Sequence, residues 1–325
     1  MIRYVIRRLL YFIPTILGVA FFTFLLFRLV GGNPAYQLAG KNATPETIQE
    51  IEKELGFDKP LFLNFKKASQ HWYYIFDSQF TFHFKQALTF HFGRSYKTKQ
   101  KISTIFKDGI GPSLSLAIPS FFIGIFLSIS IALFAAFYRG SWFDRIIVLF
   151  SVIGLSIPFL ATIIAGQYFF GYKLGLFPIS GYNFGLGSIP YLALPSLIWI
   201  FSSLGGNVRF FRTVILDEIK QDYVTTAKAK GLDNKRILFK HVLKNALIPI
   251  LTNLIVAIPF LFTGSLLLEN FFGIPGLGNV GIMALGNSDW PVINALTYIG
   301  AILFVIANLL SDVTYALVDP RIKLS

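Results

Sequence analysis

The stretch RFFRTVILDEIKQDYVTTAKAKGLDNKRILFKHVLKNALIP, residues 209–249, is rich in lysine and arginine and lies between two long apolar runs. The run before it reaches Val208 without a charge, and the run after it covers residues 245–268. A polar segment of this length is too short for a catalytic domain, and its helix-forming pattern is too regular for a linker. We therefore expect it to present short helices to another protein at a membrane surface.

The rest of the chain is strongly apolar. Of the 325 residues, 54% are hydrophobic and only 14% are charged, against roughly 25% charged in soluble domains. A helix needs about 20 apolar residues to cross the ~30 Å hydrocarbon core, and six charge-free runs reach that length. The runs are residues 9–27, 109–138, 146–172, 174–208, 245–268 and 290–311. The fourth run is too long for one helix, so its span is placed at residues 189–208. The sequence therefore predicts an all-α integral membrane protein with six transmembrane helices.

The distribution of charge orients this protein in the membrane. A net charge of +13 would suggest nucleic acid as the partner of a soluble protein. Here, however, the cations of the short loops gather on one side of the predicted membrane. Residues 209–244 carry nine Lys or Arg, whereas residues 269–290 carry none, as the positive-inside rule requires for an inside and an outside loop. Residues 31–107 carry eleven, yet long loops translocate largely regardless of charge. We expect both termini to be cytoplasmic and no nucleic acid to bind.

This orientation divides the chain into four parts. Residues 1–30 form the first transmembrane helix, and residues 31–110 form an extracytoplasmic, aromatic-rich segment between helices 1 and 2. Residues 111–318 hold the other five helices and the cytoplasmic loop of about residues 209–249. Residues 319–325 are a cytoplasmic tail. Pro158 is expected to lie inside the third helix as a tolerated kink.

Local signals are clearest in the extracytoplasmic segment. Thr44 followed by Pro45 is a good helix start, and Gly56 suits the end of the same helix. Residues 57–96 are dense in Phe, Tyr and Trp, with Lys between them. Two interpretations stay open for this part: an amphipathic piece in the membrane interface, or a docking surface for an external partner.

The sequence contains none of the common motifs for catalysis or ATP binding. The chain has no G-x-x-x-x-G-K-[ST] loop, no H-E-x-x-H and no G-x-S-x-G, it lacks cysteine, and its four histidines are widely spaced. We therefore expect no catalytic residues and no metal site. Asp312 is the only acidic residue near the interior of a predicted span, whereas proton-coupled carriers need buried relays. The energy source is expected to lie outside this subunit.

The pattern of the 209–249 loop is helix–glycine–helix. Residues 216–229 and 233–247 both favour helix, with Gly231 breaking the chain between them and Asp233 able to cap the second helix. The cations could lie on anionic headgroups, gaining about 1 kcal/mol each. Alternatively, the helices could dock in a groove of a partner protein. The pattern alone leaves both interpretations open.

The second half of this loop also carries a resemblance. YVTTAKAKGLDNKRILFKHVLKNALIP, residues 223–249, resembles the cytoplasmic EAA loop of permeases from ABC importers of the dipeptide, oligopeptide and nickel family. Other segments similar to that family follow one another from end to end. They are RYVIRRLLYFIPTILGVAFFTF (3–24), LGFDKP (55–60), HFGRS (91–95), LENFFGIPGLG (268–278), DWPV (289–292) and DVTYALVDPRIKL (312–324).

The resemblance implies a permease subunit of an ATP-driven importer that moves di- or oligopeptides across the bacterial inner membrane. Its expected partners are a second homologous permease, two cytoplasmic ABC ATPase subunits, an extracytoplasmic substrate-binding protein and the lipid bilayer. The chain itself would be no enzyme and would bind no cofactor, because ATP and Mg would be held by the ATPase subunits. Nickel or another small cargo is an alternative within the family, and a secondary transporter is an alternative outside it.

The EAA loop would be the helix that couples the permease to the ATPase. The expected coupling residues are Tyr223, Thr225, Thr226, Ala227, Lys228, Ala229, Lys230, Gly231, Leu232 and Arg236. The chain departs from the family pattern where Thr-Thr-Ala stands for Glu-Ala-Ala and where Lys244 stands for a proline. The stretch between residues 66 and 90 looks longer than in common dipeptide members.

Overall fold

The computed structural model describes residues 2–30, 34–39, 43–65 and 71–318, and the regular elements in these ranges are all helices. This confirms the all-α class. The chain divides into two compact units. The first unit consists of Met1–Asp108 with Val280–Ile306, and the second of Gly109–Asn279 with Ala307–Ser325. Each unit is described by itself.

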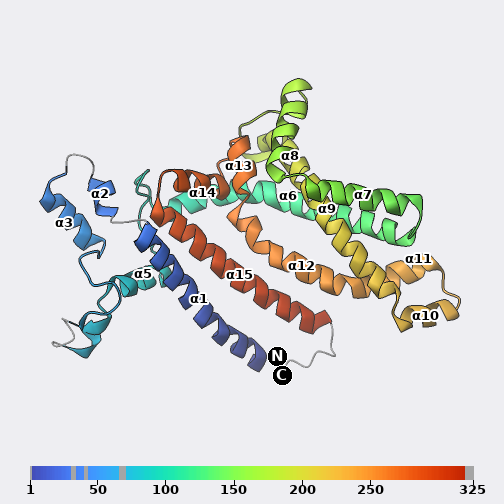
Figure 1. Cartoon of the computed structure of the whole chain (residues 1–325), viewed down its shortest axis with the longest axis horizontal. Coiled ribbons are helices and arrows are strands. Elements are labelled where there is room, and N and C mark those ends of the chain that lie inside the picture. Colours follow the sequence, from blue (N-terminus) through green and yellow to red (C-terminus); the bar gives the residue numbers. More distant parts are fainter. Residues whose placement is uncertain (1, 31–33, 40–42, 66–70, 319–325) are drawn as a thin grey trace. The chain divides into compact units, whose positions relative to one another are not determined.

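The first unit is built around the long apolar helix at the start of the chain. Its helices are α1 (Ile2–Val30), α2 (Pro34–Ala39), α3 (Pro45–Glu54), η1 (Trp72–Phe76) and α5 (Gln79–Leu88) (Figure 1). The unit also holds the beginning of α6 (Ile102–Phe137), most of α14 (Leu277–Gly286) and the first part of α15 (Trp290–Val318). The predicted start of α3 is confirmed, because the Thr44 side chain accepts a hydrogen bond from the Thr47 amide and Pro45 follows. Gly56 has a φ of +72°, as a glycine just past a helix end requires.

Aromatic side chains make much of the core of the first unit. Phe24 of α1 lies edge-on to Phe62 and Phe80, with ring centroids 5.7 and 5.4 Å apart. The buried Asp289 side chain holds a neighbouring loop, accepting hydrogen bonds from the Ser95 hydroxyl and from the Tyr96 amide at 2.9 Å. The aromatic-rich segment thus contributes side chains to the packed core of this unit. This packing does not decide between the two interpretations of its surface.

The second unit contains a bundle of long helices and several short ones (Figure 1). Its elements are most of α6 (Ile102–Phe137), then α7 (Trp142–Ser156), α8 (Phe159–Gly166), η2 (Gln167–Lys173), η3 (Gly185–Ser188), α9 (Ile189–Ile219), α10 (Asp222–Ala229), α11 (Asn234–Arg236), η4 (Ile237–Val242), α12 (Leu243–Thr263), α13 (Leu266–Phe272), the start of α14 (Leu277–Gly286) and the end of α15 (Trp290–Val318). Helix α9 packs against both α7 and α12.

Four stretches of the described chain are long and apolar enough to cross a membrane as single helices, and two bent helix pairs raise the number to six. The four are Ile102–Phe137, Gly185–Ile219, Asn234–Pro259 and Trp290–Ser311. The bent pairs are Trp142–Ser156 with Phe159–Lys173 and Leu266–Phe272 with Leu277–Gly286. Helix α1 adds a shorter described apolar stretch, Ile13–Arg28. The protein is a multi-span membrane protein, as predicted.

The bends correct two expectations from the sequence. Pro158 does not lie inside a kinked third helix: α7 ends at Ser156, and α8 starts at Phe159 at 95° to it. The proline ring and missing N–H stop helical hydrogen bonding, and no helical turn bridges the gap. The stretch expected to be a loop after residue 268 instead forms α13 and α14, which are bent by 88°.

A buried glutamate explains the second bend. The Glu269 side chain is fully buried and accepts hydrogen bonds from the Ser113 hydroxyl at 2.9 Å and the Ser265 amide at 3.1 Å. Its other oxygen accepts from the amides of Gly278 and Asn279 at 2.7 and 3.1 Å. The carboxylate therefore caps the start of α14 and pins it to α13, because an anion is favoured at a helix N-terminus.

Candidate functional site

The loop at residues 209–249 begins as a continuation of a spanning helix. Helix α9 runs on to Ile219, and the chain then turns at Gln221 before α10 starts at Asp222. The single helix expected over residues 216–229 is therefore wrong. Across the break, the Tyr223 hydroxyl donates a hydrogen bond of 2.8 Å to Glu218 Oε1. The turn changes the direction of the chain so that one face of α10 meets the bundle.

Helix α10 is fixed to the bundle by a hydrophobic cluster, which we call the coupling-end core. Val224 and Ala227 of α10 are 1% and 7% exposed and pack in it. The other buried members come from four elements: Ala132, Leu133 and Ala136 of α6; Phe211, Ile215 and Leu216 of α9; Ile237, Leu238 and Val242 of η4; and Ala246 and Ile250 of α12. Burying a larger apolar side chain such as Val224 contributes ~1.5–3 kcal/mol, which fastens α10 to the bundle.

The glycine break predicted after α10 is confirmed. Gly231 has a φ of +76°, and a Cβ atom built on it would meet no atom within 4 Å. Asp233 then caps the next helix, accepting a hydrogen bond from the Lys235 amide at 3.2 Å. The following turn, Ile237–Val242, is π-helical, a widened geometry that often lies at functional sites. Glycine is needed here for its backbone conformation, and its surroundings leave space for a partner.

The predicted coupling residues divide into an outer and an inner group. Seven are exposed: Thr225, Thr226, Lys228, Ala229, Lys230, Gly231 and Arg236. We call these seven the outer face of the loop. Tyr223 and Leu232 are half-buried, and Ala227 lies in the coupling-end core. Ala227 therefore contributes to packing under α10, and close approach by another protein is open only to the outer face.

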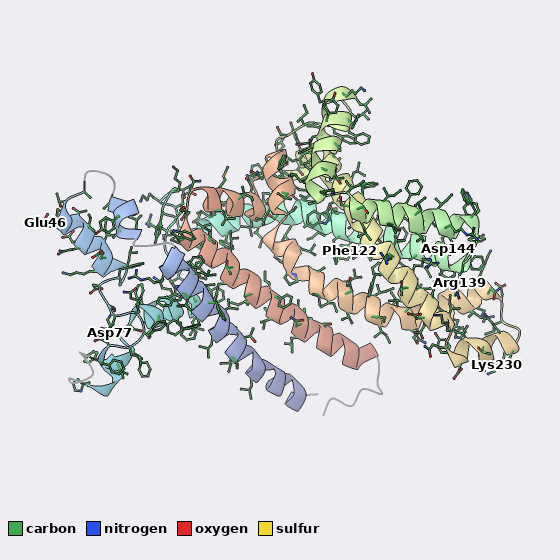
Figure 2. The ribbon with its side chains drawn as sticks, viewed as in Figure 1. Glu46, Asp77, Phe122, Arg139, Asp144 and Lys230 are labelled. Carbon is green, nitrogen blue, oxygen red and sulfur yellow. The ribbon has the colours of Figure 1, made fainter. Side chains whose placement is uncertain are left out.

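The outer face is cationic. Figure 2 shows Lys230 at the same end of the second unit as Arg139 and Asp144. Lys228, Lys230 and Arg236 belong to the face, and Lys235 and Lys240 beside it are also exposed. Tyr223 stays protonated next to them: burial and the hydrogen bond with Glu218 raise the pKa of its hydroxyl to about 12. The face thus presents positive charge with a neutral phenol beneath it.

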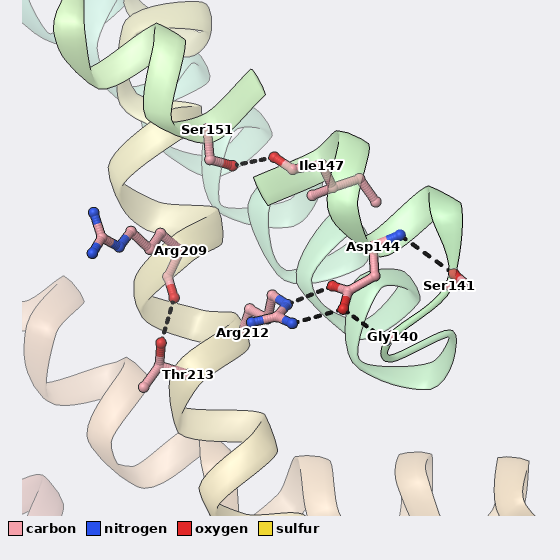
Figure 3. Close-up of polar contacts among 8 residues, drawn as sticks. All are labelled: Gly140, Ser141, Asp144, Ile147, Ser151, Arg209, Arg212 and Thr213. Atoms are coloured by element: carbon pink, nitrogen blue, oxygen red, sulfur yellow. Dashed lines mark hydrogen bonds and ion pairs between the residues drawn. The ribbon is translucent and has the colours of Figure 1, made fainter. Parts of the chain in front are cut away.

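One arginine of the 209–249 loop pairs with a buried carboxylate of the protein itself. Arg212 of α9 donates two hydrogen bonds to the Asp144 carboxylate of α7, from Nε at 2.7 Å and from Nη2 at 2.8 Å (Figure 3). Asp144 also accepts from the Gly140 amide at 2.9 Å, and its side chain is 6% exposed. This bidentate pair joins the start of α7 to α9, the helix that precedes α10.

Nothing in the sequence alone singles out this pair. Asp144 lies between the second and third apolar runs, and Arg212 is one of nine cations in the loop. The available signal was their position, because each lies at the edge of an apolar run where an unpaired charge would be costly. Among the described residues, no three His, Cys, Asp or Glu side chains gather as a metal site requires.

Comparisons with known proteins find relatives over nearly the whole chain. Residues 124–324 match the family described as binding-protein-dependent transport system inner membrane component, and residues 1–117 match the N-terminal part of such membrane components. A protein of Brucella abortus named as a peptide transport system permease is 33% identical over 323 residues, covering 98% of each chain. A peptide ABC transporter permease protein of Sinorhizobium fredii is 32% identical, over 98% of this chain and 99% of its own. The glutathione transport system permease protein of Salmonella typhimurium is 33% identical, over 99% of each chain.

Proposed function

Because the chain belongs to the family of binding-protein-dependent transport system inner membrane components, we propose that it is the permease subunit of an ATP-driven importer of peptides. The single observation that carries the cargo class is similarity over nearly the whole chain to proteins named as peptide permeases. Glutathione, named for a relative of equal identity, is itself a small peptide. The proposed cargo is therefore a di- or oligopeptide or a peptide-like compound.

In this proposal the chain does no chemistry of its own. Two cytoplasmic ABC ATPase subunits bind ATP and Mg, a second homologous permease completes the path, and an extracytoplasmic binding protein delivers cargo. The N- and C-termini lie in the cytoplasm, so that the outer face of the loop meets the ATPase subunits. The cations of that face and the space beside Gly231 suit a groove with acidic side chains or helix C-termini.

The same arrangement suggests how movement at the loop reaches the membrane helices. Helix α10 shares its core with α6, α9 and α12, so a push on α10 displaces these helices together. Arg212 and Asp144 link α9 to α7 as well. Close-packed interiors transmit displacement instead of absorbing it. ATP-driven closure of the partners would thereby rock the bundle between inward- and outward-facing states.

Replacing Gly231 with leucine tests the coupling role. The branched side chain would fill the space that we assign to the partner and would strain a backbone with positive φ. We expect uptake of a radiolabelled dipeptide into proteoliposomes to fall at least tenfold, and cargo-stimulated ATP hydrolysis to fall with it. Membrane insertion should be unchanged, as measured by the yield of folded permease.

A matched control is Gly175→Leu. Gly175 also has a positive φ, of +61°, and open space around its Cβ position, but it lies in the loop between η2 and η3. The same strain there should leave uptake within about twofold of wild type. Normal ATP-driven uptake by the Gly231 variant would contradict the assignment of the loop. Saturating uptake of nickel, with no competition from dipeptides or glutathione, would contradict the assignment of the cargo.

A further inference from the structure

The first unit contains a partly open cavity that the proposed coupling mechanism does not use. It has a volume of about 160 Å³ and is lined by side chains of α1, α5, the loop after α5 and the start of α15. A water molecule takes about 30 Å³ of the liquid, so the cavity has room for a larger group. Its apolar wall includes Phe24, Phe27 and Phe82, and Arg94 stands at an exposed position of its lining.

The charged groups of the lining are all basic. Arg28 and Arg94 contribute guanidinium groups, and the lining contains no Asp or Glu. Arg28 stacks over the Phe57 ring at 4.3 Å and also interacts electrostatically with Glu52 outside the lining. Arg94 uses one of its donors on the Lys99 carbonyl, at 3.1 Å. A guanidinium group has five N–H donors, so donors remain for an anion.

Two buried polar atoms of the lining indicate how a bound group would be oriented. Trp290 Nε1, a donor, and Asn294 Oδ1, an acceptor, have no hydrogen-bond partner among the described residues. Buried polar groups are nearly always hydrogen-bonded, and these two come from successive turns of one helix. A ligand that bonds to both atoms must accept a hydrogen bond from Trp290 Nε1 and donate one to Asn294 Oδ1. Beside two guanidinium groups, the accepting part is expected to carry negative charge.

We propose that this cavity binds the carboxyl-terminal residue of a peptide. The terminal carboxylate would accept from Arg28, Arg94 and the Trp290 indole, and the amide N–H of the same residue would donate to Asn294 Oδ1. A carboxyl-terminal residue carries these two groups two bonds apart, and its side chain can lie against the phenylalanine rings. The inference rests on the proposed function, in which peptides are the cargo.

A lipid phosphate is the main competing occupant, since arginine and aromatic side chains also suit headgroups. The peptide terminus is favoured because it carries its own N–H donor next to the carboxylate, whereas a phosphate itself has none for Asn294. In addition, much of the lining comes from α5 and its following loop, which belong to the segment expected to be extracytoplasmic. His83 in the lining does not add a cation at neutral pH, because burial lowers its pKa to about 4. Only the two arginines are therefore charged.

The test measures binding to the assembled transporter in nanodiscs of neutral lipid, without binding protein and without ATP. Isothermal titration would compare Ala-Ala with three probes: its carboxyl-terminal amide, acetate, and short-chain phosphatidylglycerol. We expect Ala-Ala to bind at least tenfold more tightly than the amide or acetate. Asn294→Leu, which removes the acceptor for the ligand's amide N–H, should weaken Ala-Ala binding by tenfold or more. Trp290→Phe should weaken it severalfold.

The control variant is Lys97→Gln, which removes an exposed cation from the same loop without touching the lining; it should bind Ala-Ala like wild type. Equal binding of the amide, or acetate binding as tightly as Ala-Ala, overturns the proposal, as does tighter binding of phosphatidylglycerol. Absence of any probe binding at 10-fold higher concentrations than transport requires also overturns it. Because uptake is measured separately, failure of peptide transport remains distinguishable from failure of this site.

Discussion

Asp144 and Glu269 are both buried carboxylates of the second unit, yet the protein holds them in different ways. Asp144 accepts two hydrogen bonds from the Arg212 guanidinium, which belongs to another long helix. Glu269 accepts four hydrogen bonds from neutral donors, three of them amides of its own bent helix pair. The first arrangement joins two helices through charge, and the second fixes the shape of one turn. Helix-to-helix links suit the transmission of movement, whereas a cage of amides suits a fixed bend.

The largest effect is expected from Glu269→Ala. This change leaves four donors without an acceptor, two of them in fully buried hydrogen bonds. At ~1–3 kcal/mol for each unsatisfied buried donor, we expect a loss on the order of 5 kcal/mol in the free energy of unfolding. Glu269→Gln keeps one carbonyl oxygen and should lose less. Thermal unfolding of the purified permease in detergent measures both. A melting temperature of the alanine variant equal to wild type would show that the amide cage does not hold the bend.

Arg212→Met should have the next largest effect. It leaves the Asp144 charge buried and uncompensated, and breaking such a pair costs about 3–5 kcal/mol. The double variant Asp144→Asn with Arg212→Met should be more stable than Arg212→Met alone, because the orphaned charge is gone. If the pair also transmits movement, this double variant should fold but show reduced cargo-stimulated ATP hydrolysis. A double variant less stable than Arg212→Met alone would show that the uncompensated Asp144 charge is not what destabilises the single variant.

A smaller effect, dependent on pH, is expected at His83 of the first unit, which is half-buried and whose pKa shift comes from burial alone. Burial lowers the pKa of its ring to about 4 in the folded protein, against about 6.5 in an unfolded chain. The folded state therefore binds the proton less well, and stability is full above about pH 6.5 and falls as the pH drops toward 4. The loss is on the order of 3 kcal/mol, at 1.36 kcal/mol for each pKa unit.

Melting curves between pH 4 and 7 check this. His83→Gln should flatten the pH dependence, whereas His91→Gln, at an exposed position, should leave it as in wild type. An unchanged slope in the His83 variant would assign the acid sensitivity to other groups.

The smallest effect is expected from Lys220→Ala. Lys220 forms an ion pair with Asp217 at 3.0 Å, but both side chains are more than 60% exposed. Exposed pairs are typically worth only 0.2–1 kcal/mol and are screened by salt. The variant should melt within about 1 °C of wild type, and the difference should vanish at high salt. A loss as large as that of Arg212→Met would remove the distinction between buried and exposed pairs.

Local signals were predicted well because they depend on a few neighbouring residues. Thr44 and Asp233 cap helices, and Gly56 and Gly231 adopt positive φ, as their sequence contexts indicated. Pro158 was the exception. A proline inside an apolar run can either kink a helix or end it, and packing around the run decides which. The structure ends the helix there.

The sequence by itself determined that this chain is helical, spans a membrane several times, and carries a cationic loop broken by a glycine. These properties follow from composition, from the period of apolar residues and from the backbone freedom of glycine. Only the tertiary structure decided that Ala227 faces inward, that Asp144 meets Arg212 across 68 residues of chain, and that Glu269 closes a bend. Such contacts depend on which faces of different helices pack together. The sequence pattern of one helix does not specify which other helix packs against it.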